Sequence, residues 1–253
     1  MAEVVVLGSG TSNGVPMVGM DYRPEFLANP KNHRSRAAIA VLGPTGNLLV
    51  DCPPELRLQL TCANIKRVEA TLITHTHADH IMGMDDLRSI CLLTGTAMPV
   101  YTTPQYQEDI RRVFNYAFRE FPPGVDVPRF DLFTVEENLS VGGLEFRIFQ
   151  VWHGKTPVLG LRVNNFAYIT DVSEIPEDVY PLLEGLDTLI LDAVRLRPHP
   201  NHFHYERALQ EAEKIGAKMT YFTHLSHDYD HDVTEANMPP NVRLCYDGQR
   251  IQI

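Results

Sequence analysis

A dense group of possible metal ligands follows one apolar run of the sequence. In LITHTHADH (72–80), His75, His77, Asp79 and His80 fall within six consecutive positions after the run ends. Four such side chains would repel one another when charged, whereas a metal ion binds neutral imidazoles and carboxylates together. The HxHxDH pattern after an apolar strand therefore predicts a metal site.

Three more residues of the same kind also stand at the ends of apolar runs. His153 follows LEFRIFQVW, Asp171 follows FAYIT, and His224 follows MTYFT. Each alone would be an ordinary loop or core residue, but loops that leave a rigid sheet are where sites are built. Together with the first four they make five His and two Asp. This is too many for one tetrahedral ion and suits two ions that share a bridging carboxylate.

The elements that would position these residues are predicted by hydrophobic patterning. Apolar runs rich in β-branched residues predict strands at 3–8, 37–43, 47–52, 70–74, 98–103, 144–151, 158–163, 165–171, 187–193, 218–225 and 241–253. Helical periodicity is present at 53–63, 84–94, 104–117, 176–184 and 204–215. Two mixed sheets with helices outside would bury this many strands on both faces. We therefore expect a single α/β domain over residues 1–253.

Local signals refine this expectation at three places. Gly216 follows the last helical segment and is expected to cap it in the left-handed conformation. Asp247-Gly248 predicts a two-residue hairpin within 241–253. The proline-rich segment 119–130 is expected to be an ordered loop rather than a boundary between domains.

Composition restricts the partners of the protein. The chain has 253 residues, 44% of them hydrophobic, and no run of about 18 apolar residues that could cross a membrane. Its first residues lack the basic region of a signal peptide, so a cytoplasmic location is expected. The net charge of −10 disfavours nucleic acid and leaves only a locally cationic site for an anionic substrate. The four cysteines show no CxxC spacing and are expected to be reduced thiols.

The order of these motifs along the chain resembles the metallo-β-lactamase superfamily. THTHADH (74–80) is followed by VWH (151–153), ITD (169–171) and FTH (222–224), and the match extends over essentially the whole chain. Within the superfamily the sequence is most similar to PhnP-type phosphodiesterases and, more distantly, to tRNase Z. The resemblance implies a four-layer αββα sandwich with a dinuclear site at one edge of its two sheets.

The resemblance also implies a ligand assignment and a reaction. His75, His77 and His153 would bind one ion, Asp79, His80 and His224 the other, and Asp171 would bridge the two. The implied protein is a dinuclear metal-dependent phosphodiesterase for small cyclic or nucleotide-like substrates, in which a metal-bridging hydroxide attacks phosphorus. Zn²⁺, Mn²⁺ and Fe all fit such ligands. Self-association as a homodimer is expected by analogy.

Charge in this implied site differs in sign from the charge of the whole chain. Two divalent ions contribute +4, Asp79 and Asp171 subtract two, and the hydroxide subtracts one, which leaves about +1. A small anionic phosphodiester would therefore be attracted locally, although the chain carries −10.

Residues outside the ligand set complete the implied chemistry. His202, six residues before Ala208, matches a His in the PhnP and tRNase Z relatives that contacts the scissile phosphate, so it is expected to bind substrate and to act with Asp79 in catalysis as the general acid. His204 is expected at a helix N-terminus and His199 in a loop. Asp51 and Asp192 end apolar strands and could orient ligating imidazoles, although for Asp51 a turn cap is an equally good interpretation.

The glycine-rich segment GSGTSNG (8–14) departs from the dinucleotide fingerprint, because its third glycine is one place late and no helix follows. Phosphate binding at this loop stays open. Arg34 and Arg36 lie downstream and are candidate anion ligands, with a solvated surface role as the alternative.

Two features depart from the related families. PhnP-type relatives hold a structural zinc with three cysteines, where this chain has Met20, Tyr22 and Glu25 and leaves His227 without its partners. No lysine- and glycine-rich arm for gripping tRNA is present, so a tRNA 3′-processing-like nuclease is disfavoured. A thioester or lactone hydrolase on the same scaffold, and a scaffold protein with structural metals only, remain as alternatives.

Overall fold

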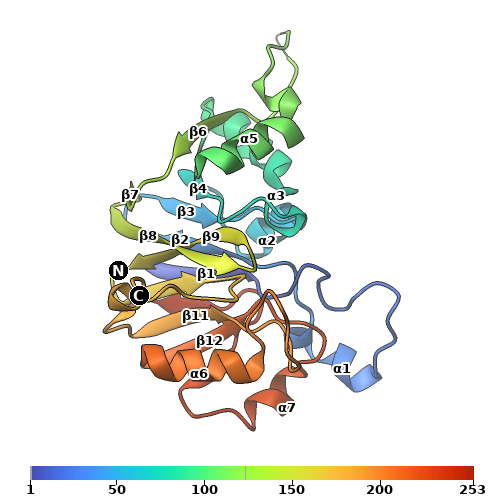
Figure 1. Cartoon of the computed structure of the whole chain (residues 1–253). Coiled ribbons are helices and arrows are strands. Elements are labelled where there is room, and N and C mark those ends of the chain that lie inside the picture. Colours follow the sequence, from blue (N-terminus) through green and yellow to red (C-terminus); the bar gives the residue numbers. More distant parts are fainter. Residues whose placement is uncertain (1, 123) are drawn as a thin grey trace.

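The strands form two seven-stranded sheets that lie face to face (Figure 1), in a computed structural model that describes residues 2–122 and 124–253. The first sheet has the order β14-β1-β2-β3-β4-β5-β6 and the second the order β13-β12-β11-β10-β9-β8-β7. In the first sheet β1, β2 and β3 pair antiparallel, β3 to β6 pair parallel, and β14 returns antiparallel to β1. In the second sheet β7 to β10 pair antiparallel and β10 to β13 pair parallel.

The bounds of the strands are as follows. The first sheet contains β1 (Glu3–Gly8), β2 (Ala38–Leu42), β3 (Asn47–Val50), β4 (Ala70–Leu72), β5 (Met98–Thr102), β6 (Phe130–Thr134) and β14 (Arg250–Gln252). The second contains β7 (Asn138–Val141), β8 (Leu144–His153), β9 (Thr156–Val163), β10 (Phe166–Ile169), β11 (Thr188–Asp192), β12 (Met219–Thr223) and β13 (Val242–Leu244).

Helices cover the outer face of each sheet (Figure 1). The α-helices are α1 (Pro24–Ala28), α2 (Leu56–Cys62), α3 (Ala78–Ile81), α4 (Arg88–Thr94), α5 (Pro104–Val113), α6 (Tyr205–Ile215) and α7 (His231–Glu235). Single 3₁₀ turns are η1 (Pro30–Asn32), η2 (Met84–Leu87), η3 (Asn115–Phe118) and η4 (Tyr180–Leu183). No helix in the described ranges has the length and apolar character that crossing a bilayer requires.

The core is divided by the sheets into three layers of buried apolar side chains. The middle layer joins the inner faces of both sheets, for example Ile39 of β2 with Tyr168 of β10. One outer layer packs the first sheet against helices such as α5, and the other packs the second sheet against α6, where Ala208 is buried. This arrangement confirms the predicted αββα sandwich.

Several local predictions are confirmed. Gly216 has φ +71° and its N–H donates to the Ala212 carbonyl, so it caps α6 as expected. Cys52, Cys91 and Cys245 are buried, Cys62 is exposed, and all four are free thiols.

The predicted hairpin at Asp247-Gly248 is wrong. β13 pairs with β12 in the second sheet, whereas β14 pairs with β1 in the first. The carboxylate of Asp247 explains the difference, because it accepts hydrogen bonds from the N–H groups of Ser9 and Ser35 and fixes a turn that carries the chain from one sheet to the other.

Other boundaries also differ from the predictions. The segment 176–184 forms only the turn η4, which has a proline in its first positions. The strands β6 and β7 were not predicted. In the proline-rich segment 119–130, Pro123 lies outside the described residues, and β6 begins at Phe130.

Candidate metal centre

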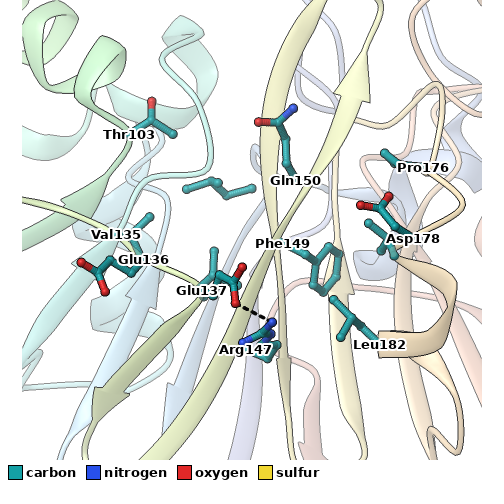
Figure 2. A pocket seen from close by; sticks show the side chains of 13 residues that line it. Thr103, Val135, Glu136, Glu137, Arg147, Phe149, Gln150, Pro176, Asp178 and Leu182 are labelled. Carbon is teal, nitrogen blue, oxygen red and sulfur yellow. Dashed lines mark ion pairs between the residues drawn. The ribbon is translucent and has the colours of Figure 1, made fainter.

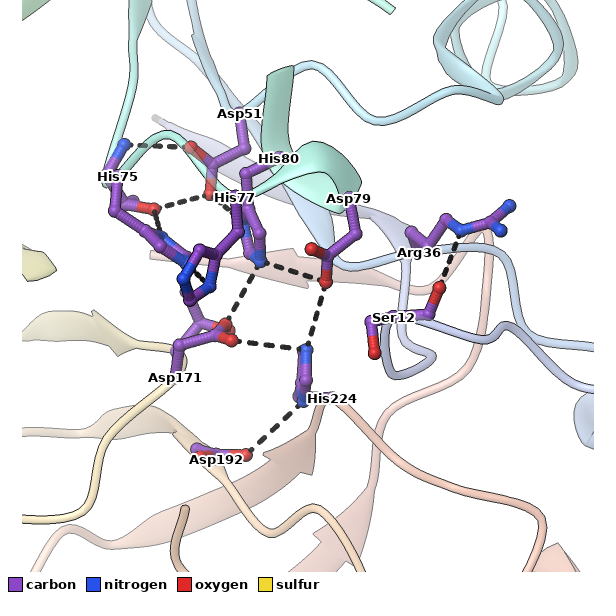
Figure 3. A network of polar contacts seen from close by, with 12 residues as sticks. Ser12, Arg36, Asp51, His75, His77, Asp79, His80, Asp171, Asp192 and His224 are labelled. Atoms are coloured by element: carbon purple, nitrogen blue, oxygen red, sulfur yellow. Dashed lines mark hydrogen bonds and ion pairs between the residues drawn. The ribbon is translucent and has the colours of Figure 1, made fainter. Parts of the chain in front are cut away.

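All seven predicted ligands meet at one edge of the sandwich, where strands of both sheets end. His75 follows β4, His153 is the last residue of β8, Asp171 follows β10, and His224 follows β12 directly. The seven residues His75, His77, Asp79, His80, His153, Asp171 and His224 are called the His–Asp cluster below. Figure 3 shows six of its side chains pointing toward one another from opposite sheets.

The HxHxDH segment is partly helical. His77 is the N-cap of α3, and Asp79 and His80 lie within its single turn. Helical backbone places these two neighbouring side chains about 100° apart around the axis, so that both reach the cluster.

The three imidazoles implied for the first ion lie together. Nε2 of His75 is 2.9 Å from Nδ1 of His77. The ring of His153 has its centroid 5.2 Å from that of His77 and 5.9 Å from that of His75. The three imidazole rings therefore lie next to one another, and one proton shared between His75 and His77 would have to leave before both nitrogens could bind a cation.

The groups implied for the second ion are equally close. Oδ2 of Asp79 lies 3.4 Å from Nε2 of His80 and 3.6 Å from Nε2 of His224. The carboxylate of Asp171 is 3.3 Å from each of these two nitrogens. Asp171 also has an oxygen within 4.8 Å of ligand atoms of His153 and His202. Its carboxylate thus borders both groups, which is the position a bridging ligand would need.

The donor set fits divalent cations. Nε2 of His80 and both ring nitrogens of His224 are buried and have no hydrogen-bond partner within the described part of the chain. Buried polar atoms without partners are costly, and imidazole nitrogens that converge with two carboxylates are the ligands that Zn²⁺ and similar ions use.

Hydrogen bonds from outside the cluster fix the orientation of its histidines. Oδ2 of Asp51 lies 2.7 Å from Nδ1 of His80, and the same carboxylate accepts hydrogen bonds from the N–H and the hydroxyl of Thr74. The Thr74 hydroxyl also lies 3.1 Å from Nδ1 of His75. Asp51 therefore orients a ligand, as one interpretation predicts, whereas its other hydrogen bonds reach Thr74 and not the turn that follows Asp51 in the chain.

On the other side of the cluster the orienting groups are Asp192 at the end of β11 and Asn201 in the loop before α6. Nδ1 of His153 lies 2.6 Å from the Asn201 carbonyl, which turns its Nε2 toward the cluster. Oδ2 of Asp192 accepts a hydrogen bond from the N–H of Val172 and lies 2.8 Å from Nδ1 of His202. Such outer hydrogen bonds hold metal ligands in place and set their tautomers.

Three residues of the site have left-handed backbone conformations that favour glycine. The φ angles are +66° for Asp51, +51° for Asp171 and +59° for His224. Each costs on the order of 1–3 kcal/mol for a residue with a side chain. The sequence gives no signal of this strain, which turns these side chains into the site directly after their strands.

The ionisation of the cluster is shifted by burial and by neighbouring charges. Burial alone would raise the pKa of Asp171, but His224 and His80 outweigh it and lower that pKa well below its usual range. Conversely, burial would lower the pKa of His224, but Asp171 and Asp79 raise it to about 9. In the absence of cations, protons on His80 and His224 balance the carboxylates, whereas burial lowers the pKa of His75 and of His153. Metal binding would replace these protons.

The sequence also singled out histidines outside the ligand set, of which His202 adjoins the cluster. The ring of His202 has its centroid 4.3 Å from that of His153 and 4.9 Å from that of His224, so His202 adjoins the cluster as predicted. His204 is the N-cap of α6. His227 lies beside Asp228, with Nε2 3.5 Å from Oδ1.

The structure does not bring Arg34 to the cluster as a substrate ligand. Its side chain is only 1% exposed, and its guanidinium donates hydrogen bonds to the Tyr229 carbonyl and to Oδ1 of Asn32. Arg36 is partly exposed, donates from Nε to the Ser12 carbonyl and pairs with Glu55. Its role toward substrate stays a prediction.

Arg34 instead explains how the loop without zinc cysteines is held. Its hydrogen bond to Tyr229 joins the N-terminal loop to the loop after β12, and Oδ1 of Asn32 accepts a second link from the N–H of His231. Tyr22 stacks on Phe26, with 5.1 Å between ring centroids. Within the described residues, no group of candidate metal ligands includes His227.

Comparison with known proteins agrees with this geometry. A family model described as "Beta-lactamase superfamily domain" matches residues 46–225. An octanoyltransferase from Porphyromonas gingivalis is 32% identical over 248 residues, which are 96% of this chain and 50% of that protein. A ribonuclease Z from Gloeothece citriformis is 30% identical over 159 residues, 61% of this chain and 45% of that protein. The chain thus spans half or less of the length of these curated relatives.

Two solved structures match over nearly their whole length. A diphosphatase of the PhnP family superposes with a TM-score of 0.92 at 36% identity and covers 100% of this chain and 98% of its own. The short form of human tRNase Z has a TM-score of 0.70 at 21% identity, with 99% of each chain covered, and shows a common fold. From the family match and this fold we conclude that the chain belongs to the β-lactamase superfamily, in its metallo-β-lactamase form.

Proposed function

We propose that the protein is a dinuclear metal-dependent hydrolase that cleaves phosphodiester bonds in small cyclic or nucleotide-like substrates. The observation that carries this proposal is the position of His202. A buried carboxylate, that of Asp192, holds its imidazole directly beside the seven ligand-type side chains of the His–Asp cluster. An imidazole at this place could protonate the alkoxide that leaves a phosphodiester, whereas the thiolate that leaves a thioester needs no proton donor.

The cluster residues would hold two cations in the two groups described above. His75, His77 and His153 would hold one, Asp79, His80 and His224 the other, and Asp171 would contact both. When bound, such ions supply a Lewis acid and an activated water at neutral pH. We place Asp79 in the catalytic set because its carboxylate lies between His80 and His224 and is partly open to solvent.

His202 would bind the scissile phosphate and protonate the leaving oxygen. Its Nδ1–H donates to Asp192, so Nε2 is the nitrogen that is free to face a substrate. The buried Asp192 carboxylate stabilises the positive imidazolium that a proton donor at Nε2 requires, and it prevents the ring from turning.

A second candidate substrate is the diphosphate linkage. It is favoured by the 36% identity to a PhnP-family diphosphatase over the whole chain. Both candidates have the same reacting bond, a P–O bond of a phosphoryl group with two ester or anhydride links. They differ in the leaving group, which is an alcohol for a phosphodiester and a second phosphate for a diphosphate.

The experiment is a substrate panel with metal-loaded protein. Purified protein is loaded separately with Zn²⁺, Mn²⁺ and Fe²⁺, and metal content is measured by elemental analysis. Hydrolysis of bis(p-nitrophenyl) phosphate, 2′,3′-cyclic nucleotides and an octanoyl thioester is then followed. We expect about two metals per chain and diester hydrolysis that His77→Ala abolishes. The matched control is His33→Ala, an exposed histidine whose Nε2 binds the Leu27 carbonyl.

Two results would overturn the proposal. Equal diester rates for the wild type and His77→Ala would show that the cluster does not catalyse the reaction. Hydrolysis of the thioester alone would assign the protein to acyl chemistry, in line with its octanoyltransferase relative.

A further inference from the structure

A small cavity with cationic walls opens beside His202. Its volume is about 210 Å³, and it is lined by three loops: 11–14, the stretch from Val194 to His202, and 226–228. We call it the Arg197 cavity. His202 is both a wall of this cavity and a neighbour of the His–Asp cluster, with its ring 4.3 Å from that of His153. One substrate could therefore place one of its groups in the cavity and another at the cluster.

Positive charge in this cavity is not neutralised by its walls. The guanidinium groups of Arg195 and Arg197 line it, against the single carboxylate of Asp228. His199 adds no charge near pH 7, because burial and the neighbouring His202 lower its pKa to about 4. The Asp228 carboxylate is already engaged, since Oδ1 lies 3.5 Å from Nε2 of His227 and Oδ2 accepts the N–H of Leu196. On a chain of net charge −10, a concave site with this balance would concentrate anions.

The two arginines have different tasks. The Arg195 guanidinium donates to the carbonyl groups of Arg197 and Pro198, which fixes the shape of the loop. The Arg197 guanidinium forms no ion pair with a carboxylate in the described part of the chain, and the residue is exposed. Arg197 is therefore free to bind an anion, whereas Arg195 holds it in position.

His199 and the glycine-rich loop complete the walls. Nδ1 of His199 accepts a hydrogen bond from the N–H of Asn201, so Nε2 carries the proton and can donate to a ligand. The opposite wall is held by the bond from the Thr11 N–H to the Leu225 carbonyl and by that from Arg36 to the Ser12 carbonyl. These bonds keep the cavity open between loops of both sheets.

The size of the cavity restricts its ligand. Pockets for drug-sized molecules have volumes of about 300–1,000 Å³, so about 210 Å³ suits one small anionic group better than a nucleoside. A larger cavity of about 670 Å³ lies over β8 (Figure 2), but it does not suit an anionic group. Arg147 lines this larger cavity but forms an ion pair with Glu137 at 2.7 Å. Glu136 and Asp178 also line it and add negative charge.

We propose that the Arg197 cavity binds a second phosphoryl group of the substrate, joined to the scissile phosphorus through a P–O–P link. The inference rests on the proposed function and favours its second candidate, a diphosphate diester. In this hydrolysis one water is consumed. Its oxygen bonds to the attacked phosphorus, the bond between that phosphorus and the bridging oxygen breaks, and the bridging oxygen leaves with the electron pair as part of the other phosphate. Two phosphate monoesters form, and the hydrogens of the water remain on them or pass to solvent as protons.

The test compares two substrates that differ by one phosphoryl group, bis(p-nitrophenyl) phosphate and P¹,P²-bis(p-nitrophenyl) diphosphate. Products are separated by chromatography, and kcat and KM are measured for each with metal-loaded protein. We expect Arg197→Gln to lower the ratio of kcat/KM for the diphosphate over the monophosphate diester by about tenfold or more, mainly through KM for the diphosphate. Arg197→Lys should recover part of the loss because it keeps the charge. Arg57→Gln, an exposed arginine outside the cavity, should leave the ratio unchanged.

The outcomes separate the two proposals. If the wild type cleaves a substrate and Arg197→Gln leaves the ratio unchanged, the cavity does not bind a second phosphoryl group, and the proposed hydrolase activity stands. If metal-loaded wild type cleaves neither substrate, the proposed function and the inference that rests on it both fall.

Discussion

Oδ2 of Asp192 lies 2.8 Å from Nδ1 of His202, and the two residues come from different layers of the molecule. Asp192 ends β11, a central strand of the second sheet, and is fully buried. His202 lies in the loop before α6 and is partly open to solvent. A carboxylate fixed by the sheet thus orients an imidazole that the loop alone could not hold in one place.

Asp192→Asn is expected to reduce turnover more than metal binding. An asparagine side chain would still reach His202 but would not stabilise its imidazolium, so kcat for diesters should fall by about 10- to 100-fold. Elemental analysis should still find metal, because Asp192 is not a proposed ligand and its Oδ1 lies 3.8 Å from Nδ1 of the ligand His224, beyond hydrogen-bond distance. Asp187→Asn is the matched control, since Asp187 lies on the surface beside Lys218. An unchanged kcat would contradict the role of Asp192.

Asp51→Asn is expected to show the opposite pattern, a loss of metal affinity. Asp51 contacts His80 at 2.7 Å, and replacing such an orienting carboxylate typically costs about 10- to 100-fold in affinity. Asparagine tolerates the left-handed conformation that Asp51 adopts, with φ +66°, so the backbone should remain intact. Competition with a chromogenic chelator measures the affinity. A Kd equal to that of the wild type would remove Asp51 from the site.

The sequence was most informative where a residue type and its position after an apolar strand indicated a single role. Residues such as His153 and His224 could be found because a ligand-type residue stood at the end of an apolar strand, and strands of one sheet end at a common edge. Hydrophobic patterning shows where the strands lie. The order and direction of the strands, on which the convergence of these residues depends, were implied by the family resemblance.

The sequence was least informative where a signal had two possible structural uses. Asp247-Gly248 has the composition of a hairpin turn, but hydrogen bonds of Asp247 to Ser9 and Ser35 make it a crossing between sheets. Arg34 has the charge of an anion ligand, but its side chain is buried against Tyr229. Both outcomes depend on partners roughly 200 residues away in the chain, which local patterns do not encode.

The stability of the metal-free protein should fall as pH rises from 7 to 9. Burial would lower the pKa of His224, but Asp171 and Asp79 raise it to about 9, above the value of about 6.5 for an unfolded histidine. A group with a raised folded pKa contributes stability that is complete below the unfolded value and is lost as pH rises through the folded value.

The measurement is Tm in the presence of a chelator at pH 6.5, 7.5 and 9. Metal-loaded protein serves as the control, because cations replace these protons and bind more tightly as pH rises. A metal-free Tm that increased over the same range would contradict the proposed ionisation of the cluster.

Arg34→Met is expected to destabilise the protein without directly altering the metal centre. The change removes the donors to the Tyr229 carbonyl and to Asn32, and the buried acceptors that remain unsatisfied cost about 2 kcal/mol. Burial of the guanidinium lowers the pKa of Arg34 to about 10, so part of the cost is offset when this charge is removed. Urea unfolding measures the difference, with Arg57→Met expected within about 0.5 kcal/mol of wild type. Equal stability of the two variants would show that Arg34 does not hold these loops.

The role of His202 as proton donor can be tested by varying the leaving group. A leaving alkoxide is strongly basic and needs a proton as the P–O bond breaks, whereas p-nitrophenolate is stable as an anion. If His202 supplies that proton, His202→Ala should slow hydrolysis of an alkyl diester, such as a cyclic nucleotide, by about 10²- to 10⁴-fold. The loss with bis(p-nitrophenyl) phosphate should be much smaller and should reflect only the lost contact to phosphate. His204→Ala, at the N-cap of α6, is the control from the same segment. If both substrates lost the same factor, His202 would bind the phosphate without donating a proton, because only proton transfer depends on the basicity of the leaving oxygen.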